Sequence, residues 1–96
     1  MDKEYKIKEK HSVDLVREIS VDWNGWNFLI IYGKHINGWV IAVPNWSVCI
    51  EAGDPTNIDY NARKLYDQMK SYSKSRVIAR AVCEHWEGIN KNESED

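Results

Sequence analysis

Apolar and polar residues alternate along residues 13 to 50, with the two-residue period of β-strands that bury one face. Asn-Gly occurs twice in this stretch, at Asn24-Gly25 and at Asn37-Gly38. Asn-Gly favours a two-residue hairpin turn, because both central positions of that turn need a positive φ. The pattern therefore predicts an antiparallel meander of strands.

The turns also predict the register of the strands. Centring each turn on Asn-Gly pairs Trp23 with Trp26 and Ile36 with Trp39. A third tight turn at Pro44-Asn45 pairs Val43 with Trp46. Because side chains alternate along a strand, one face then collects an apolar set, with Arg17 and Lys34 as interruptions. The set is Val13, Leu15, Ile19, Val21, Trp23, Trp26, Phe28, Ile30, Tyr32, Ile36, Trp39, Ile41, Val43, Trp46, Val48 and Ile50.

The apolar spacing becomes helical in the second half of the chain. Asp54 followed by Pro55 is typical of a helix start, and the apolar positions then favour a helix to about Lys70. A second helix is predicted from a cap at Ser73 or Ser75 to a stop at Gly88. The two apolar stripes are Ile58, Ala62, Leu65 and Met69 in the first helix, and Val77, Ile78, Ala81, Val82 and Trp86 in the second.

Together these elements predict an α+β fold, an antiparallel β-meander of about four strands followed by two α-helices packed on its aromatic face. Residues 13–88 form the single α+β domain. Residues 1–12 are a charged N-terminal segment, in which Tyr5 and Ile7 allow a short edge strand. Residues 89–96 are an acidic flexible tail.

Composition narrows the class of protein. The net charge of −2 argues against a general nucleic-acid binder, and no apolar run is long enough for a membrane helix. The charged N-terminus does not resemble a secretory signal, so we expect a cytoplasmic protein with Cys49 and Cys83 reduced.

Candidate chemistry rests on three histidines, His11, His35 and His85. None stands beside a serine or cysteine in a recognisable nucleophile motif, and Cys83-Glu84-His85 lacks the usual zinc spacing. We therefore expect no enzyme activity, metal or cofactor, and no motif indicates a small-molecule substrate. The tryptophans could stack on bases or sugars, but the predicted register favours a place in the core.

The second face of the predicted sheet is partly apolar, which a solvated face would not need. Cover by the N-terminal segment or a loop is one explanation, and a surface for a protein partner or a homodimer is the other. This register sets Val40 across from His35 and Ala42 across from Gly33. The candidate partner-binding residues are an apolar strip, which also includes Ala42, and an acidic rim. They are Val16, Glu18, Asp22, Leu29, Ile31 and Val40.

Basic residues concentrate in the predicted helices. Residues 61–80 contain six lysines and arginines against one acidic residue, Asp67. Such a surface is an ordinary solvated helix exterior, or a site that binds phosphates or an acidic protein. The candidate nucleic-acid-binding residues are Arg63, Lys70, Lys74, Arg76 and Arg80.

Four short motifs carry a resemblance to known sequences. They are residues 33–38 (GKHING), 44–46 (PNW), 54–56 (DPT) and 60–62 (YNA). Over residues 12–88 the pattern resembles small uncharacterised proteins of Gram-positive bacteria and their mobile elements. The resemblance implies a bacterial cytoplasmic setting with a phage or plasmid context, and it assigns no catalytic residue.

The function expected from these observations is a small non-enzymatic protein-binding module. In a mobile-element setting, such a module could inhibit a host defence system in the manner of anti-CRISPR proteins. The alternative is a nucleic-acid-binding accessory protein that uses the basic helical surface.

Overall fold

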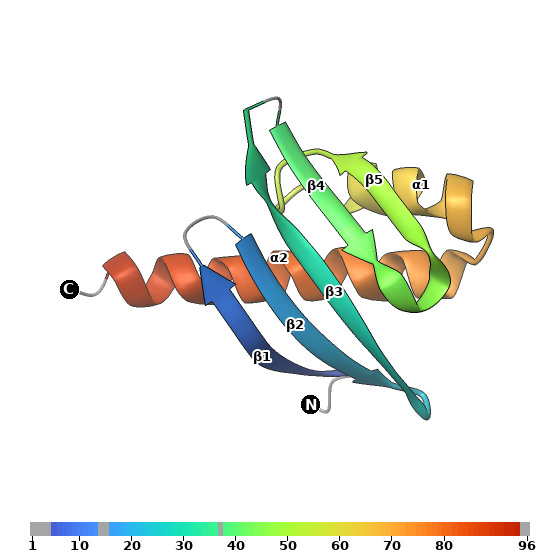
Figure 1. The fold of residues 1–96 in the computed structure, drawn as a ribbon, viewed down its shortest axis with the longest axis horizontal. Helices are drawn as coiled ribbons and strands as arrows, with labels where there is room; N and C mark the ends of the chain where they lie inside the picture. Colours follow the sequence, from blue (N-terminus) through green and yellow to red (C-terminus); the bar gives the residue numbers. More distant parts are fainter. Residues whose placement is uncertain (1–4, 14–15, 37, 95–96) are drawn as a thin grey trace.

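The computed structural model describes residues 5–13, 16–36 and 38–94. Within them, one antiparallel sheet contains β1 (Tyr5–Val13), β2 (Val16–Trp23), β3 (Trp26–His35), β4 (Gly38–Val43) and β5 (Val48–Ala52) in chain order. The short 3₁₀ helix η1 (Pro44–Trp46) joins β4 to β5, and α1 (Ile58–Met69) and α2 (Tyr72–Ser94) follow. Both helices lie on the same face of the sheet, behind it in Figure 1. The predicted α+β class is confirmed, with five strands rather than about four.

The additional strand, β1, comes from the charged N-terminal segment, and it is the edge strand that Tyr5 and Ile7 allowed, extended to Val13. It pairs with β2 from Tyr5 opposite Trp23 to Val13 opposite Val16, with an irregularity between Glu9 and His11. Tyr5 is 4% exposed and belongs to the core. The charged residues of this segment hid a two-residue period that alternates toward and away from α2.

The first hairpin has the predicted register. Trp23 pairs with Trp26, and Val21 pairs with Phe28. Asn24 has φ 52° and Gly25 has φ 84°, as a turn with two positive-φ central residues requires. The Asn-Gly signal is therefore confirmed at this position.

The turn of the second hairpin lies one residue earlier than predicted, and this shifts the cross-strand partners by two residues. His35 pairs with Gly38 and Lys34 with Trp39, so Ile36 lies in the turn and is 98% exposed rather than facing the core. Asn37 lies outside the described residues. Gly38 has φ 132°, which glycine tolerates, and β4 starts directly at this residue.

The third turn is longer than predicted. Val43 pairs with Val48 rather than Trp46, because η1 and Ser47 occupy the loop. The Ser47 N–H donates to the Pro44 carbonyl over 3.1 Å, and Ser47 is left-handed with φ 56°. A shift of two residues leaves every side chain on its predicted face, since the period of a strand is two. The cross-strand partners change instead.

The core lies between the sheet and the helices. Most of its members come from the predicted sheet face and the predicted helix stripes, and Tyr5 of β1 and Ala79 of α2 join them. Trp23, Trp39 and Trp46 are partly buried at its margin. Trp39 contacts Trp86 edge to face, with 5.1 Å between ring centroids. Trp26 is 51% exposed, because it stands beside the first turn. The side chains of Val13 and Leu15 lie outside the described residues.

The helix ends differ from the predicted ones in three places. Asn57 rather than Asp54 caps α1, and its side chain accepts a hydrogen bond from the Tyr60 N–H. The Asp54 carboxylate accepts instead from the Thr56 hydroxyl at 2.6 Å and from the Thr56 N–H at 2.8 Å, and these bonds lower the pKa of Asp54. Thus Asp54 closes a turn before the helix.

The second helix begins and ends outside its predicted limits. The Ser71 hydroxyl accepts from the Lys74 N–H, so α2 starts at Tyr72 rather than at a Ser73 or Ser75 cap. Gly88 does not end the helix, which continues to Ser94 through much of the predicted tail. A glycine inside a helix costs only about 1 kcal/mol relative to alanine, which the flanking turns offset.

A hydrogen-bonded chain ties α2 to the sheet. The Tyr32 hydroxyl lies 2.6 Å from His85 Nδ1, and His85 Nε2 lies 2.8 Å from Glu9 Oε1. Burial raises the pKa of Tyr32. A carboxylate only accepts hydrogen bonds, so His85 Nε2 donates to Glu9. A second tie runs from the Tyr5 hydroxyl to Glu84 over 2.8 Å.

The first prediction concerns the β2–β3 turn. Gly25→Val should lower the free energy of unfolding by about 1–3 kcal/mol, because valine is strained at positive φ. No atom lies within 4 Å of an added Cβ, so the cost is conformational rather than steric. Gly88→Ala, a matched change inside α2 with equally open space, should instead stabilise by about 0.5–1 kcal/mol. Thermal melts showing no difference between these variants would contradict the turn geometry.

The second prediction concerns the tie between α2 and the sheet. Tyr32→Phe removes the hydroxyl partner of His85 and should cost about 1–3 kcal/mol, because a nitrogen in a half-buried ring loses its partner. Tyr66→Phe removes a hydroxyl from a 43% exposed residue and should change stability by less than about 0.5 kcal/mol. Urea unfolding measures both, and equal midpoints for the two variants would remove the stabilising role of the chain.

Candidate functional site

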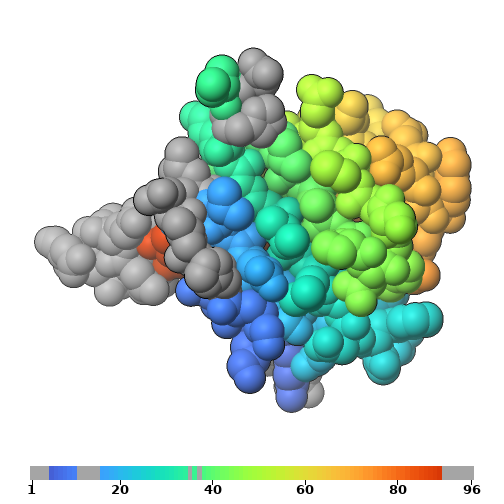
Figure 2. Space-filling model, viewed as in Figure 1, coloured from blue at the N-terminus to red at the C-terminus, as the bar shows by residue number. Residues whose placement is uncertain are grey.

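The candidate site is the face of the sheet that points away from the helices, which we term the open face. Figure 2 shows this face, with the side chains of β2 to β5 at the surface and no described helix in front of them. Val16 is 49% exposed, while Leu29, Ile31, Val40 and Ala42 are half-buried. Within the described residues, the predicted apolar strip is therefore not covered by another element.

The cross-strand pairs make the strip continuous. In one row, Gly33 of β3 lies between Val16 of β2 and Val40 of β4. In the next row, Ile31 lies between Glu18 and Ala42. These partners replace the predicted pairing of Val40 with His35 and of Ala42 with Gly33. The structure thus brings the predicted apolar residues together, in a different register.

A shallow depression of about 190 Å³ lies in the middle of the strip. Its position follows from Gly33, which presents no side chain between the flanking valines of the neighbouring strands. The depression is lined by Val16, Ile31, Tyr32, Gly33, Lys34, Val40 and Ala42. Its shape fits a single apolar side chain rather than a drug-sized ligand.

Part of the predicted acidic rim already has partners within the sheet. The Asn27 side-chain amide donates to Asp22 at 2.5 Å and to the Ser20 hydroxyl at 3.0 Å. Lys6 of β1 lies across from Asp22 on the other side. β2 is an interior strand, because β1 pairs with it on the side away from β3. Glu18, opposite Ile31, is the acidic residue nearest the centre of the strip.

Both edges of the sheet carry features that discourage further strand pairing. On β5, the Gln68 amide donates to the Cys49 carbonyl over 3.1 Å and accepts from the Cys49 N–H over 3.4 Å. On β1, the exposed Lys6 and Lys8 and the irregularity after Glu9 have the same effect. The open face is therefore more available for contact than the edges.

The predicted basic residues do not form one patch. Arg63 and Arg76 line one groove between α1 and α2, and Lys70 is the C-cap of α1. Lys74 lies over the rings of Trp26 and Trp46, and Arg80 lies over the Tyr5 ring. Lys74 and Arg80 are both on α2, but the rings that they contact belong to β3, η1 and β1.

The histidines and cysteines give no reactive centre within the described residues. His85 is the tie between Tyr32 and Glu9, a role that its sequence surroundings did not reveal. The side chains of His11 and His35 lie outside the described part of the chain. Cys49 is exposed and Cys83 is buried, and burial raises the pKa of the Cys83 thiol. The described residues contain no cluster of three potential metal ligands.

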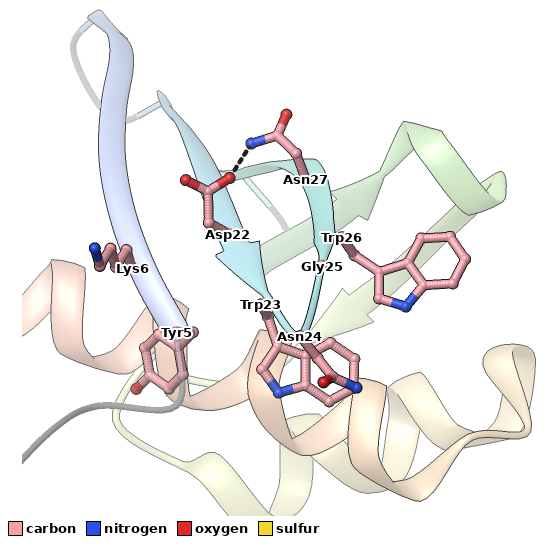
Figure 3. A pocket seen from close by; sticks show the side chains of 8 residues that line it. All are labelled: Tyr5, Lys6, Asp22, Trp23, Asn24, Gly25, Trp26 and Asn27. Carbon is pink, nitrogen blue, oxygen red and sulfur yellow. Dashed lines mark hydrogen bonds between the residues drawn. The ribbon is translucent and has the colours of Figure 1, made fainter.

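A hollow of about 400 Å³ adjoins the β2–β3 turn but is a poor binding site. Figure 3 shows that the side chains lining this hollow do not point toward a common centre. Asp22 and Asn27 extend to one side of the sheet, while the rings of Tyr5 and Trp23 extend to the other. No single ligand could contact both groups without passing through the strands.

Comparison with known proteins places the chain in a family without giving it an activity. Neither the search of curated proteins nor that of solved structures found a match. None of the helices in the described residues is long and apolar enough to span a membrane. A family model, described as a family of unknown function, matches residues 2–90, nearly the whole chain. The chain is therefore a member of DUF6618, a small α+β protein family of unknown function.

Proposed function

We propose that the protein is a non-enzymatic protein-binding module whose partner covers the open face. The observation that carries the proposal is the continuous apolar strip on the face opposite the core. A sheet needs only one buried face to be stable, so an apolar centre on the second face calls for its own explanation. A partner that contacts the strip supplies it.

The side chains of the open face indicate what kind of partner surface would fit it. The depression over Gly33 accepts one apolar side chain, which would sit between Val16 and Val40. Glu18, next to Ile31, is available to meet a lysine or arginine at the rim of that contact. The expected partner surface is thus an apolar anchor with a basic residue beside it.

The modest exposure of the strip favours a reversible partner over a permanent dimer. Leu29, Ile31, Val40 and Ala42 are each only half-buried, so the apolar area that they offer is small. Obligate homodimers bury larger and more apolar surfaces. We therefore commit to a different protein as the occupant, with a homodimer as the competing outcome.

The sequence resemblance to mobile-element proteins narrows the proposed role. Inhibition of a bacterial defence system in the cytoplasm, in the manner of anti-CRISPR proteins, is the first role to test. Such targets carry basic nucleic-acid channels, and the Glu18 side of the open face is the part of this surface that complements them.

The third prediction tests the open face. Ile31→Lys should weaken partner binding at least tenfold, because a charge enters the apolar centre. The fold should survive, since Glu18 lies opposite as a counter-ion. Ile36→Lys introduces the same charge at a turn residue that is 98% exposed, and should leave binding unchanged.

Affinity capture from a bacterial lysate identifies the partner, and calorimetry with the purified partner gives the Kd for each variant. Sedimentation velocity of the wild type distinguishes a homodimer. Equal affinity of the wild type and Ile31→Lys would place the contact elsewhere. Unfolding of Ile31→Lys would show that the strip is part of the core.

A further inference from the structure

A second surface, distinct from the open face, combines arginines with tyrosine rings. It is a groove of about 470 Å³ between α1 and α2. Asp59, Ala62, Arg63 and Tyr66 come from successive turns of α1, and Tyr72 and Arg76 come from the first turns of α2. The helical spacing of these positions turns each set toward the other helix.

The two arginines of the groove differ in whether the guanidinium group has a partner in the described part of the chain. Arg76 forms an ion pair with Asp59, with 3.1 Å between Nη1 and Oδ1, and lies over the Tyr72 ring at 5.8 Å. The hydrogen bond to Asp59 raises the pKa of Arg76. Arg63 makes no hydrogen bond or ion pair with the described part of the chain. Its charge is available to a ligand.

Both tyrosine rings of the groove are exposed. Tyr72 is 67% exposed and Tyr66 is 43% exposed. Exposed aromatic residues are common singly, but here two rings share a groove with two arginines. Aromatic faces and cations along one groove are the combination that binds single-stranded nucleic acid, because bases stack on the rings and phosphates meet the cations.

We propose that the groove between α1 and α2 binds a short stretch of single-stranded nucleic acid. A base stacks on the exposed Tyr72 ring, and the adjoining phosphates contact Arg63 and the outer side of Arg76. The acidic balance of the whole chain does not oppose this, because the groove itself is lined by Arg63 and Arg76 against Asp59. The proposal is independent of the protein partner on the open face.

Fluorescence anisotropy with a labelled ten-nucleotide oligothymidine tests the groove, over a range of salt concentrations. Two phosphate contacts predict a slope of about −1.4 for log K against log salt, and Arg63→Gln should reduce it by about 0.7. Tyr72→Leu removes the ring and should weaken binding roughly fivefold or more with little change in the slope. Lys6→Gln removes one charge from β1 and should leave both quantities unchanged.

Four results would overturn the proposal. Three are absence of binding at low salt, an equal loss of affinity in Lys6→Gln and Arg63→Gln, and equal binding of a blunt duplex. The fourth is tighter binding of an acidic peptide than of the oligonucleotide, since a peptide site does not need the stacking ring. Circular dichroism of each variant separates a loss of binding from a loss of fold.

Discussion

The rest of the structure depends on the burial of one face of a five-stranded sheet under two helices. Once Ile19, Phe28 and Ile41 are committed to that face, the two-residue period of the strands commits every neighbour to the other. The residues between them therefore reach the surface whether or not they are polar. The open face is a direct consequence of how the core is built, and its apolar content has to be explained by something other than folding.

The sequence predicted the faces better than it predicted the turns. Asn24-Gly25 forms the expected turn. At the second and third turns the cross-strand pairing shifts by two residues, so the paired side chains keep their predicted faces, while Ile36 moves into the turn. Turn residues alone do not specify the length of such a loop. At Pro44, a four-residue loop replaces the predicted two-residue turn, and in it the Ser47 N–H bonds to the Pro44 carbonyl. The edge strand that Tyr5 and Ile7 allowed is present as β1, but its length was not predicted. Its lysines obscured the alternation, and the hydrogen bond that its Tyr5 makes is to the distant helix α2.

The candidate site was predictable in composition but not in detail. Alternation alone assigned Val16, Ile31 and Val40 to one face, and the structure places them around one depression. Neither the role of Gly33 nor the link of Asp22 to Asn27 follows from spacing, because both depend on which residues stand across from each other. The same holds for Arg63 and Arg76. Their common groove depends on the angle between two helices, which periodicity does not specify.

The amide of Gln68 has a consequence for how the protein behaves in a crowded solution. It pairs with both the N–H and the carbonyl of Cys49, the two backbone groups that a sixth strand would otherwise bind at this position. Protection of the β5 edge against pairing with a second chain therefore depends on α1 staying packed against the sheet. A chain whose helix has lifted would offer β5 to its neighbours as a template, which is how edge strands begin domain swapping and fibre growth.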